Sequence, residues 1–178
     1  KVSDKMIEDS TLVLFGARGN LSRVKLVPGL FHLDDSGMLP PKMKVLSVGR
    51  QLVSPDEWEA EIKDMLDKKF KGNYNKETYN RFIKRNIYHA NLPDDPNAFK
   101  KFADKLNDKN LFAPNFAFFL SVRPSDFALV VEKLAEVNLL SEDKGWKRVL
   151  IEKPFGTNLE SAIALQNSIS NHLNENQI

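Results

Sequence analysis

Two patterns of apolar and polar residues alternate along the chain. Five short β-prone runs predict strands, at residues 11–15, 44–48, 86–90, 116–121 and 148–151. The run 116–121 is apolar at almost every position, which is typical of a central parallel strand buried on both faces. Each predicted strand is followed by a segment in which apolar residues recur every three to four positions, as in a helix.

Five helices are predicted from this second pattern. The first begins at Asn20 and is expected to bend, because Pro28 in its interior removes a backbone hydrogen bond. Ser54 is expected to cap the second helix and Ser125 the fourth. The remaining helices are expected after Pro96 and from about Asn158.

The alternation of strand and helix predicts a doubly wound (Rossmann-type) α/β fold, with a mostly parallel sheet and helices on both of its faces. Residues 1–10 are polar and without periodicity, so we expect a tail there and one domain over residues 11–178. Such sheets bind ligands at the carboxyl ends of their strands. The residues that follow each predicted strand are therefore the candidates for function.

Composition and charge exclude several classes of protein. The chain has 178 residues, of which 42% are hydrophobic, enough for an ordinary core. It has no cysteine, which excludes disulfides, thiol nucleophiles and cysteine-ligated metals, and no metal site is predicted. Its net charge of +2 is far from the basic excess of a nucleic-acid-binding protein. No apolar run approaches the ~20 residues of a membrane span, so we expect a soluble, cytoplasmic protein without a membrane partner.

The first strand leads directly into Gly16-Ala17-Arg18-Gly19-Asn20-Leu21. Gly16 permits a tight turn, and Gly19 lets a ligand or the sheet approach the backbone closely. The helix that follows directs free N–H groups and a partial positive charge at the turn, which favours phosphate. Two glycines three residues apart also suit a simple strand-to-helix turn, but the strand before them and the helix after them favour nucleotide binding.

The second strand ends in Gly49-Arg50-Gln51. At this place in doubly wound domains, an acid binds the ribose 2′-hydroxyl of NAD, whereas an arginine accommodates the 2′-phosphate of NADP. Arg50 therefore favours NADP, and a merely solvated arginine is the alternative. Asp34 and Asp35 lie near the sequence distance expected for the ribose acid, but they end the first predicted helix and are interpreted as surface or turn residues.

Two lysines are further candidates for binding an anion. Lys153 lies in Glu152-Lys153-Pro154-Phe155-Gly156, after the last strand, where such sheets bind ligands. Periodicity alone slightly favours the alternative, a loop that caps the next helix and carries a surface salt bridge. Lys25, one turn into the first helix, is ambiguous when taken alone.

Together these residues resemble the coenzyme domain of the glucose-6-phosphate dehydrogenases. The resemblance extends from about Thr11 to the C-terminus and rests on the segments 16–26, 48–50, 121–125 and 152–162. The last of these, Glu-Lys-Pro-Phe-Gly-Thr-Asn-Leu-Glu-Ser-Ala, is highly specific. An unrelated NADP-linked reductase would leave it unexplained. The resemblance implies an NADP-linked oxidation of glucose 6-phosphate to 6-phosphogluconolactone, the first step of the pentose phosphate pathway.

The resemblance also implies roles for single residues. The coenzyme pyrophosphate is lined by Gly16, Ala17, Arg18, Gly19, Asn20 and Leu21. Arg50 meets the 2′-phosphate, with Gln51 beside it, while Lys25 and Lys153 face the active site. Lys153 contacts the coenzyme and the sugar phosphate alike.

Several positions depart from the family's turn, G-x-S/T-G-D-L-A. Arg18 replaces the small hydroxyl residue, Asn20 the acid and Ser22 the alanine. Loss of the acid favours phosphate binding electrostatically, whereas Arg18 either pairs with the phosphate or fills the space that it needs. After the fourth strand, Arg123 replaces the first of two paired prolines, which alters the lining of the nicotinamide side.

No catalytic residue is assigned. The family's segment Tyr-Arg-Ile-Asp-His-Tyr-Leu-Gly-Lys and its proton-accepting histidine are absent from the chain, and His32, His89 and His172 match neither context. We therefore expect no turnover from this chain alone. The resemblance implies that a C-terminal substrate and dimerisation domain, absent here, makes the full-length enzyme a homo-oligomer. A non-catalytic nucleotide-binding or interaction domain of the same fold is the alternative.

Overall fold

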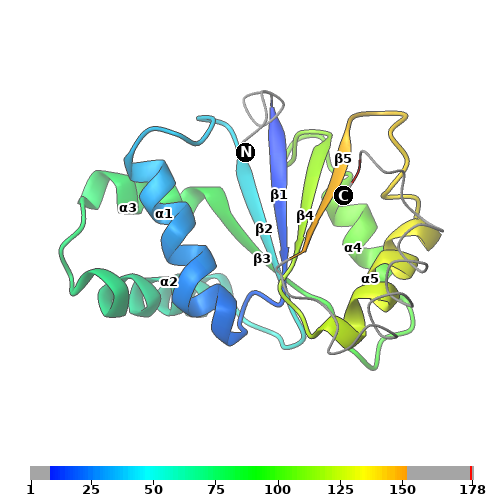
Figure 1. Cartoon of the computed structure of the whole chain (residues 1–178), viewed down its shortest axis with the longest axis horizontal. Coiled ribbons are helices and arrows are strands. Elements are labelled where there is room, and N and C mark those ends of the chain that lie inside the picture. The colour runs from blue at the N-terminus through cyan, green and yellow to red at the C-terminus, as the bar shows by residue number, and fades with distance from the viewer. Residues whose placement is uncertain (1–8, 152–176, 178) are drawn as a thin grey trace, which may run out of the picture.

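The structure is a computed structural model that describes residues 9–151 and 177, and it is built around one parallel sheet (Figure 1). The strands are β1 (Ser10–Phe15), β2 (Lys44–Gly49), β3 (Asn86–Ala90), β4 (Asn115–Leu120) and β5 (Lys147–Ile151). They lie in the order β3-β2-β1-β4-β5, and every pairing is parallel. The chain moves outward from β1 to β3 and then returns to the other side of β1, which confirms the predicted doubly wound fold.

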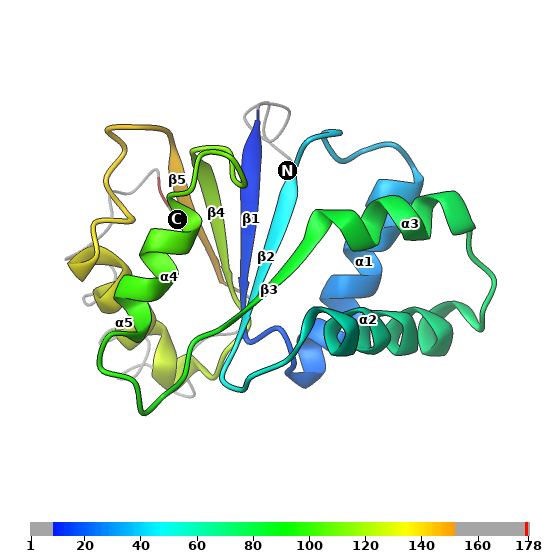
Figure 2. The ribbon, with the colours of Figure 1, turned by 180° about the vertical axis from the view of Figure 1, so that it is seen from behind.

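Helices cover both faces of the sheet (Figure 1 and, from behind, Figure 2). One face carries α1 (Val27–Asp35), α2 (Pro55–Phe70) and α3 (Lys76–Arg85), and the other carries α4 (Ala98–Leu106) and α5 (Pro124–Glu136). Neighbouring residues of a strand point to opposite faces. Leu14 of β1 accordingly packs among the first group of helices, whereas Val13 and Phe15 pack among the second. Each face of the sheet thus has its own apolar core.

The first helix accommodates Pro28 through a π-helical turn that the sequence patterns did not predict. A π-helical turn, η2 (Ser22–Leu26), directly precedes α1, and the Val27 N–H donates to the Ser22 carbonyl five residues earlier. This shift places Pro28 in the first turn of α1, where a proline is tolerated.

The predicted cap of the second helix is confirmed, and that of the fourth is wrong. The Ser54 Oγ accepts from the Glu57 N–H at 3.1 Å, and the Glu57 carboxylate accepts from the Ser54 N–H at 2.9 Å. At α5, however, Pro124 begins the helix and Arg123 occupies the cap position without a side-chain hydrogen bond. Ser125 therefore lies inside the first turn. The helix predicted from about Asn158 lies outside the described residues.

The interpretation of Asp34 as a surface or turn residue is wrong. Its side chain is only 2% exposed and forms an ion pair with Arg85, which is 3% exposed, at 3.1 Å between Oδ1 and Nη2. Arg81 also reaches Asp34, at 2.9 Å between Nε and Oδ1. Both arginines belong to α3, a helix that the sequence patterns did not predict. Asp35 is exposed, as predicted.

Candidate functional site

The carboxyl ends of β1, β2 and β4 meet around the turn that follows β1. The N–H groups of Gly16 and Ala17 both donate to the Val48 carbonyl of β2, each at 3.1 Å. On the other side, the Ser121 N–H, just after β4, donates to the Phe15 carbonyl at 2.9 Å. The turn is therefore fixed at the point where the chain order reverses across the sheet, which is where doubly wound domains bind ligands.

Gly16 is required by the shape of this turn. Its φ of +80° lies in the left-handed region that favours glycine, and a Cβ at this position would overlap the Ser121 carbonyl. Gly19 is exposed, and a Cβ there would lie 3.2 Å from the Gly16 carbonyl oxygen. Because neither glycine has a side chain, the surface of the turn at both positions consists of backbone atoms.

The turn leads into a helix whose N-terminus is open to an anion. The Arg23 N–H donates to the Gly19 carbonyl at 3.0 Å, so Gly19 is the first residue to accept a helical hydrogen bond. The N–H groups of Asn20, Leu21 and Ser22 consequently have no partner within the helix. The Ser22 hydroxyl is buried and donates to the Gly16 carbonyl at 2.9 Å, which fastens the turn from inside. Free N–H groups and the helix dipole together suit a phosphate.

Arg18 extends from the turn toward α2 and the end of β2. Its Nε donates to Glu61 Oε1 at 2.9 Å, and its Nη1 donates to the side-chain oxygen of Gln51. Glu61 also accepts from Arg23 Nη1, at 3.3 Å. The hydrogen bond to Glu61 raises the pKa of Arg18 further above its ordinary value. The guanidinium is therefore directed toward α2 and Gln51, and the two possibilities for Arg18, pairing with the phosphate or filling its space, stay predictions.

Arg50 and Gln51 lie exposed directly after β2. The Gln51 carbonyl accepts from the Tyr88 hydroxyl at 2.7 Å, and the Tyr88 ring packs 5.0 Å from that of Trp58. Burial raises the pKa of Tyr88. Gly49 makes room for this tyrosine, since a Cβ there would overlap the Tyr88 hydroxyl. Tyr88 thus fixes the backbone that presents Arg50.

Sequence reasoning missed Tyr88 and Glu61 as members of the site. They come from β3 and α2, separated from the turn by roughly 70 and 40 residues of chain, and no motif links them to it. Their only signal in the sequence is local, namely an aromatic residue in a strand and an acid in a helix.

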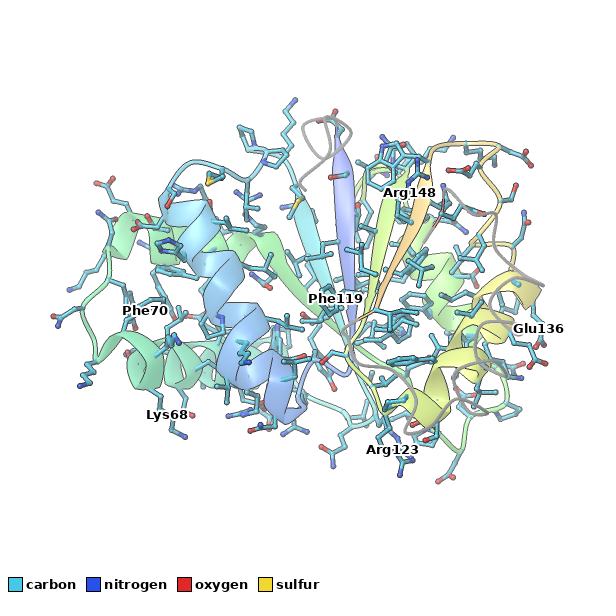
Figure 3. The ribbon with its side chains drawn as sticks, in the orientation of Figure 1. Lys68, Phe70, Phe119, Arg123, Glu136 and Arg148 are labelled. Atoms are coloured by element: carbon cyan, nitrogen blue, oxygen red, sulfur yellow. The ribbon has the colours of Figure 1, made fainter. Side chains whose placement is uncertain are left out.

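The other predicted positions are more peripheral. Lys25 is exposed on η2, in the helix that begins at the turn. Lys153 lies outside the described residues. Arg123 lies at the carboxyl end of the sheet (Figure 3) and pairs with Asp126 of its own helix at 3.2 Å. Its side chain is highly exposed.

The described histidines show no catalytic arrangement. His32 is exposed in the last turn of α1. His89 is half-buried beside Phe102, and burial lowers its pKa, with Lys105 acting in the same direction. No group of three or more metal-binding side chains is found among residues 9–151 and 177. Within the same residues, no helix has the length and apolar character needed to cross a membrane.

Comparisons with known proteins agree with this geometry. The family model described as glucose-6-phosphate dehydrogenase, NAD binding domain, matches residues 13–178. The chain is 34% identical over 170 residues to a glucose-6-phosphate 1-dehydrogenase of Treponema pallidum, covering 93% of this chain and 33% of the relative. It is 34% identical over 175 residues to the enzyme of that name from Kluyveromyces lactis, covering 96% and 35%.

Solved structures show the same likeness. One described as glucose-6-phosphate dehydrogenase in complex with its substrate glucose-6-phosphate superposes with a TM-score of 0.84 at 31% identity, over 98% of this chain and 36% of that chain. Glucose-6-phosphate 1-dehydrogenase from Mycobacterium avium superposes with a TM-score of 0.82 at 26% identity, over 96% and 35%. The chain spans about a third of the length of the relatives that it matches.

Proposed function

The chain belongs to the glucose-6-phosphate dehydrogenase family, whose NAD-binding domain it matches, and we propose that it binds NADP as the coenzyme domain of a dehydrogenase that oxidises glucose 6-phosphate. The proposed domain comprises residues 11–178 together with Ser10, which begins β1 and so does not belong to the tail predicted for residues 1–10. The reaction is the first step of the pentose phosphate pathway, and the proposed location is the cytoplasm. The full-length protein forms a homo-oligomer through a C-terminal domain.

The observation that carries the proposal is the turn between β1 and the first helix. In the turn from Gly16 to Leu21, the N–H groups of Asn20 and Leu21 have no partner within the helix, which suits the coenzyme pyrophosphate. Because Gly16 excludes a Cβ and Gly19 is exposed, the pyrophosphate can approach the backbone. A dinucleotide therefore fits the residues present.

The preference for NADP over NAD is proposed from the charges around the adenosine ribose. Arg50 is exposed at the end of β2, where a 2′-phosphate would bind, with Gln51 beside it. Asp34, the acid nearest the expected sequence distance, is buried against Arg85. It lies near the C-terminal end of α1, which runs away from the turn (Figure 1). This carboxylate is therefore not available to a ribose hydroxyl.

Lys25 and Lys153 are proposed to face the sugar phosphate. A nicotinamide coenzyme bound here would supply the acceptor for the hydride of the sugar. A base must also take the proton of the sugar hydroxyl. His32 lies exposed in the last turn of α1, and His89 lies half-buried in β3 beside Phe102. We propose that the base comes from outside the described residues.

Replacement of Arg50 tests this function. Arg50→Ala should weaken NADP binding about ten- to a hundredfold, through loss of a charge-assisted contact of ~1.5–3 kcal/mol, and leave NAD binding nearly unchanged. Lys144→Ala, which removes an exposed lysine in the turn before β5, at the opposite end of the sheet, is the matched control and should alter neither. Titration calorimetry gives both affinities, and an unaltered preference in Arg50→Ala would remove Arg50 from this role.

The hydrogen bond between Arg18 and Gln51 favours one alternative. It joins two residues that are candidates for binding the coenzyme. Such a contact is expected if the altered turn no longer binds a coenzyme and the chain is a non-catalytic interaction domain. The same titrations separate the two functions, because such a domain would bind neither NADP nor NAD.

A further inference from the structure

We infer that Arg18 is a second arginine for the ribose 2′-phosphate of NADP, held in position by Glu61, so that the phosphate binds between Arg18 and Arg50. This inference rests on the proposed NADP-binding function. It transfers Arg18 from the pyrophosphate, where the resemblance puts it, to the ribose end of the site.

The position of the Arg18 guanidinium carries the inference. Its Nε is 2.9 Å from Glu61 Oε1 on α2, and its Nη1 donates to the Gln51 side chain. Gln51 directly follows Arg50 at the end of β2, so Arg18 reaches the residue next to Arg50 from a different element. In doubly wound domains the adenosine ribose binds at the end of the second strand, whereas the pyrophosphate binds at the helix N-terminus. Arg18 is therefore directed to the ribose.

The guanidinium keeps donors for a phosphate. An arginine has five N–H groups in a planar fork that matches phosphate oxygens. Glu61 takes the Nε proton of Arg18 and Gln51 takes one Nη1 proton, which leaves the second Nη1 proton and both Nη2 protons. The side chain is 33% exposed, so these donors are accessible from solvent.

The charges around Arg18 do not cancel its attraction for a phosphate. Glu61 is shared by Arg18 and Arg23, and Arg23 also pairs with Asp64 at 3.4 Å, which in turn pairs with Lys68 at 3.0 Å. This row of alternating charges begins and ends with a cation and so retains a positive excess. A phosphate of charge about −1.5 to −2 adds the missing negative charge.

Glu57, an acid near Arg18, is bound to the start of its own helix, α2, rather than to Arg18. The negative charge of Glu57 contributes to raising the pKa of Arg18. However, its carboxylate accepts from the Ser54 N–H at 2.9 Å, which ties it to the start of its own helix. Glu61 is then the acid that positions Arg18, because it alone among the described carboxylates forms a salt bridge with this side chain.

The test compares NADP with NAD, which differ only in the 2′-phosphate, on the 178-residue chain by titration calorimetry. Arg18→Gln should weaken NADP binding roughly tenfold and change NAD binding less than about twofold. Arg23→Gln removes the same charge from the other arginine on Glu61 and is the matched control, expected to change both affinities less than about threefold. Arg18→Lys keeps the charge without the fork and should fall between the wild-type chain and Arg18→Gln. It serves as the second variant if Arg18→Gln does not fold.

The Glu61→Gln variant distinguishes two roles of Glu61, which are to position Arg18 and to repel the phosphate by its negative charge. If Glu61 positions Arg18, the ratio of NADP to NAD affinity falls in Glu61→Gln although a negative charge has been removed. In the Arg18→Gln background the same change should leave the ratio unaltered. A ratio that rises in Glu61→Gln would mean that the carboxylate only repels the phosphate, and would overturn the positioning role.

The remaining outcomes are equally decisive. If Arg18→Gln weakens NADP and NAD binding equally, the arginine binds the pyrophosphate and the inference is overturned. If it leaves both unchanged or tightens both, the side chain is structural or obstructs the site, and the inference is again overturned. A wild-type chain that binds neither nucleotide would instead overturn the proposed function, and this inference with it.

Discussion

The backbone of Gly16 lies against the carbonyl group of Ser121, so closely that even a methyl group on Gly16 would overlap the Ser121 oxygen. This contact joins the carboxyl ends of β1 and β4 at the point where the two halves of the sheet separate. The turn therefore takes its shape from backbone contacts and from the buried Ser22 hydroxyl, which leaves its outer surface open to a ligand.

Gly16→Ala should destabilise the chain strongly. A non-glycine residue at φ of +80° costs about 1–2 kcal/mol, and displacement of the Ser121 backbone should raise the total to at least about 3 kcal/mol. Gly37→Ala is the matched control, because Gly37 has a φ of +71° but an added Cβ there would meet no atom within 4 Å beyond its chain neighbours. It should cost only the ~1–2 kcal/mol of backbone strain. Urea unfolding measures both, and equal losses would mean that the contact with Ser121 is unimportant.

Asp34→Asn should also be costly, because it leaves the buried Arg85 without its counter-charge. Removing one partner of a buried ion pair typically costs about 3–5 kcal/mol. Glu136→Gln changes an acid to its amide in an exposed pair, with Lys133 at 3.8 Å (Figure 3), and should cost less than about 0.5 kcal/mol. Chemical denaturation of the two variants provides the comparison. A loss at Asp34 as small as that at Glu136 would contradict a structural role for the pair.

Stability should fall on mild acidification because of His89. Burial lowers the pKa of His89 in the folded chain, so below the ordinary value of 6.5 the unfolded chain binds the proton more readily. The contribution is fully present above pH 6.5 and is lost as the pH falls through the folded pKa. In His89→Gln, the fall in the urea midpoint between pH 7 and pH 5 should be smaller than in the wild-type chain. His32→Gln, which removes an exposed histidine, should keep the wild-type dependence, and a His89→Gln profile identical to wild type would refute the assignment.

The strands could be predicted from the sequence because their signal is local. Buried parallel strands need continuous apolar runs, and all five predicted runs match β1 to β5 with ends that differ by at most one residue. The turn at Gly16 could be predicted for the same reason, since strand, turn and helix are contiguous in the chain.

Features that depend on distant residues could not be predicted. The helix α3 is largely polar, and it is fixed to α1 by the pair of Arg85 with Asp34, residues 51 positions apart. Likewise, nothing in the sequence near Arg18 indicates Glu61 as its partner. The sequence favours Ser125 as a cap because serine is a good cap residue, but Pro124 already supplies a favourable first helical residue one position earlier.

The preference of the wild-type chain for NADP over NAD tests the central claim most directly. Titration calorimetry of the 178-residue chain with each nucleotide should give an affinity roughly tenfold or more higher for NADP, because the exposed Arg50 meets the 2′-phosphate that NAD lacks. Equal affinities, or no binding of either nucleotide, would contradict the account.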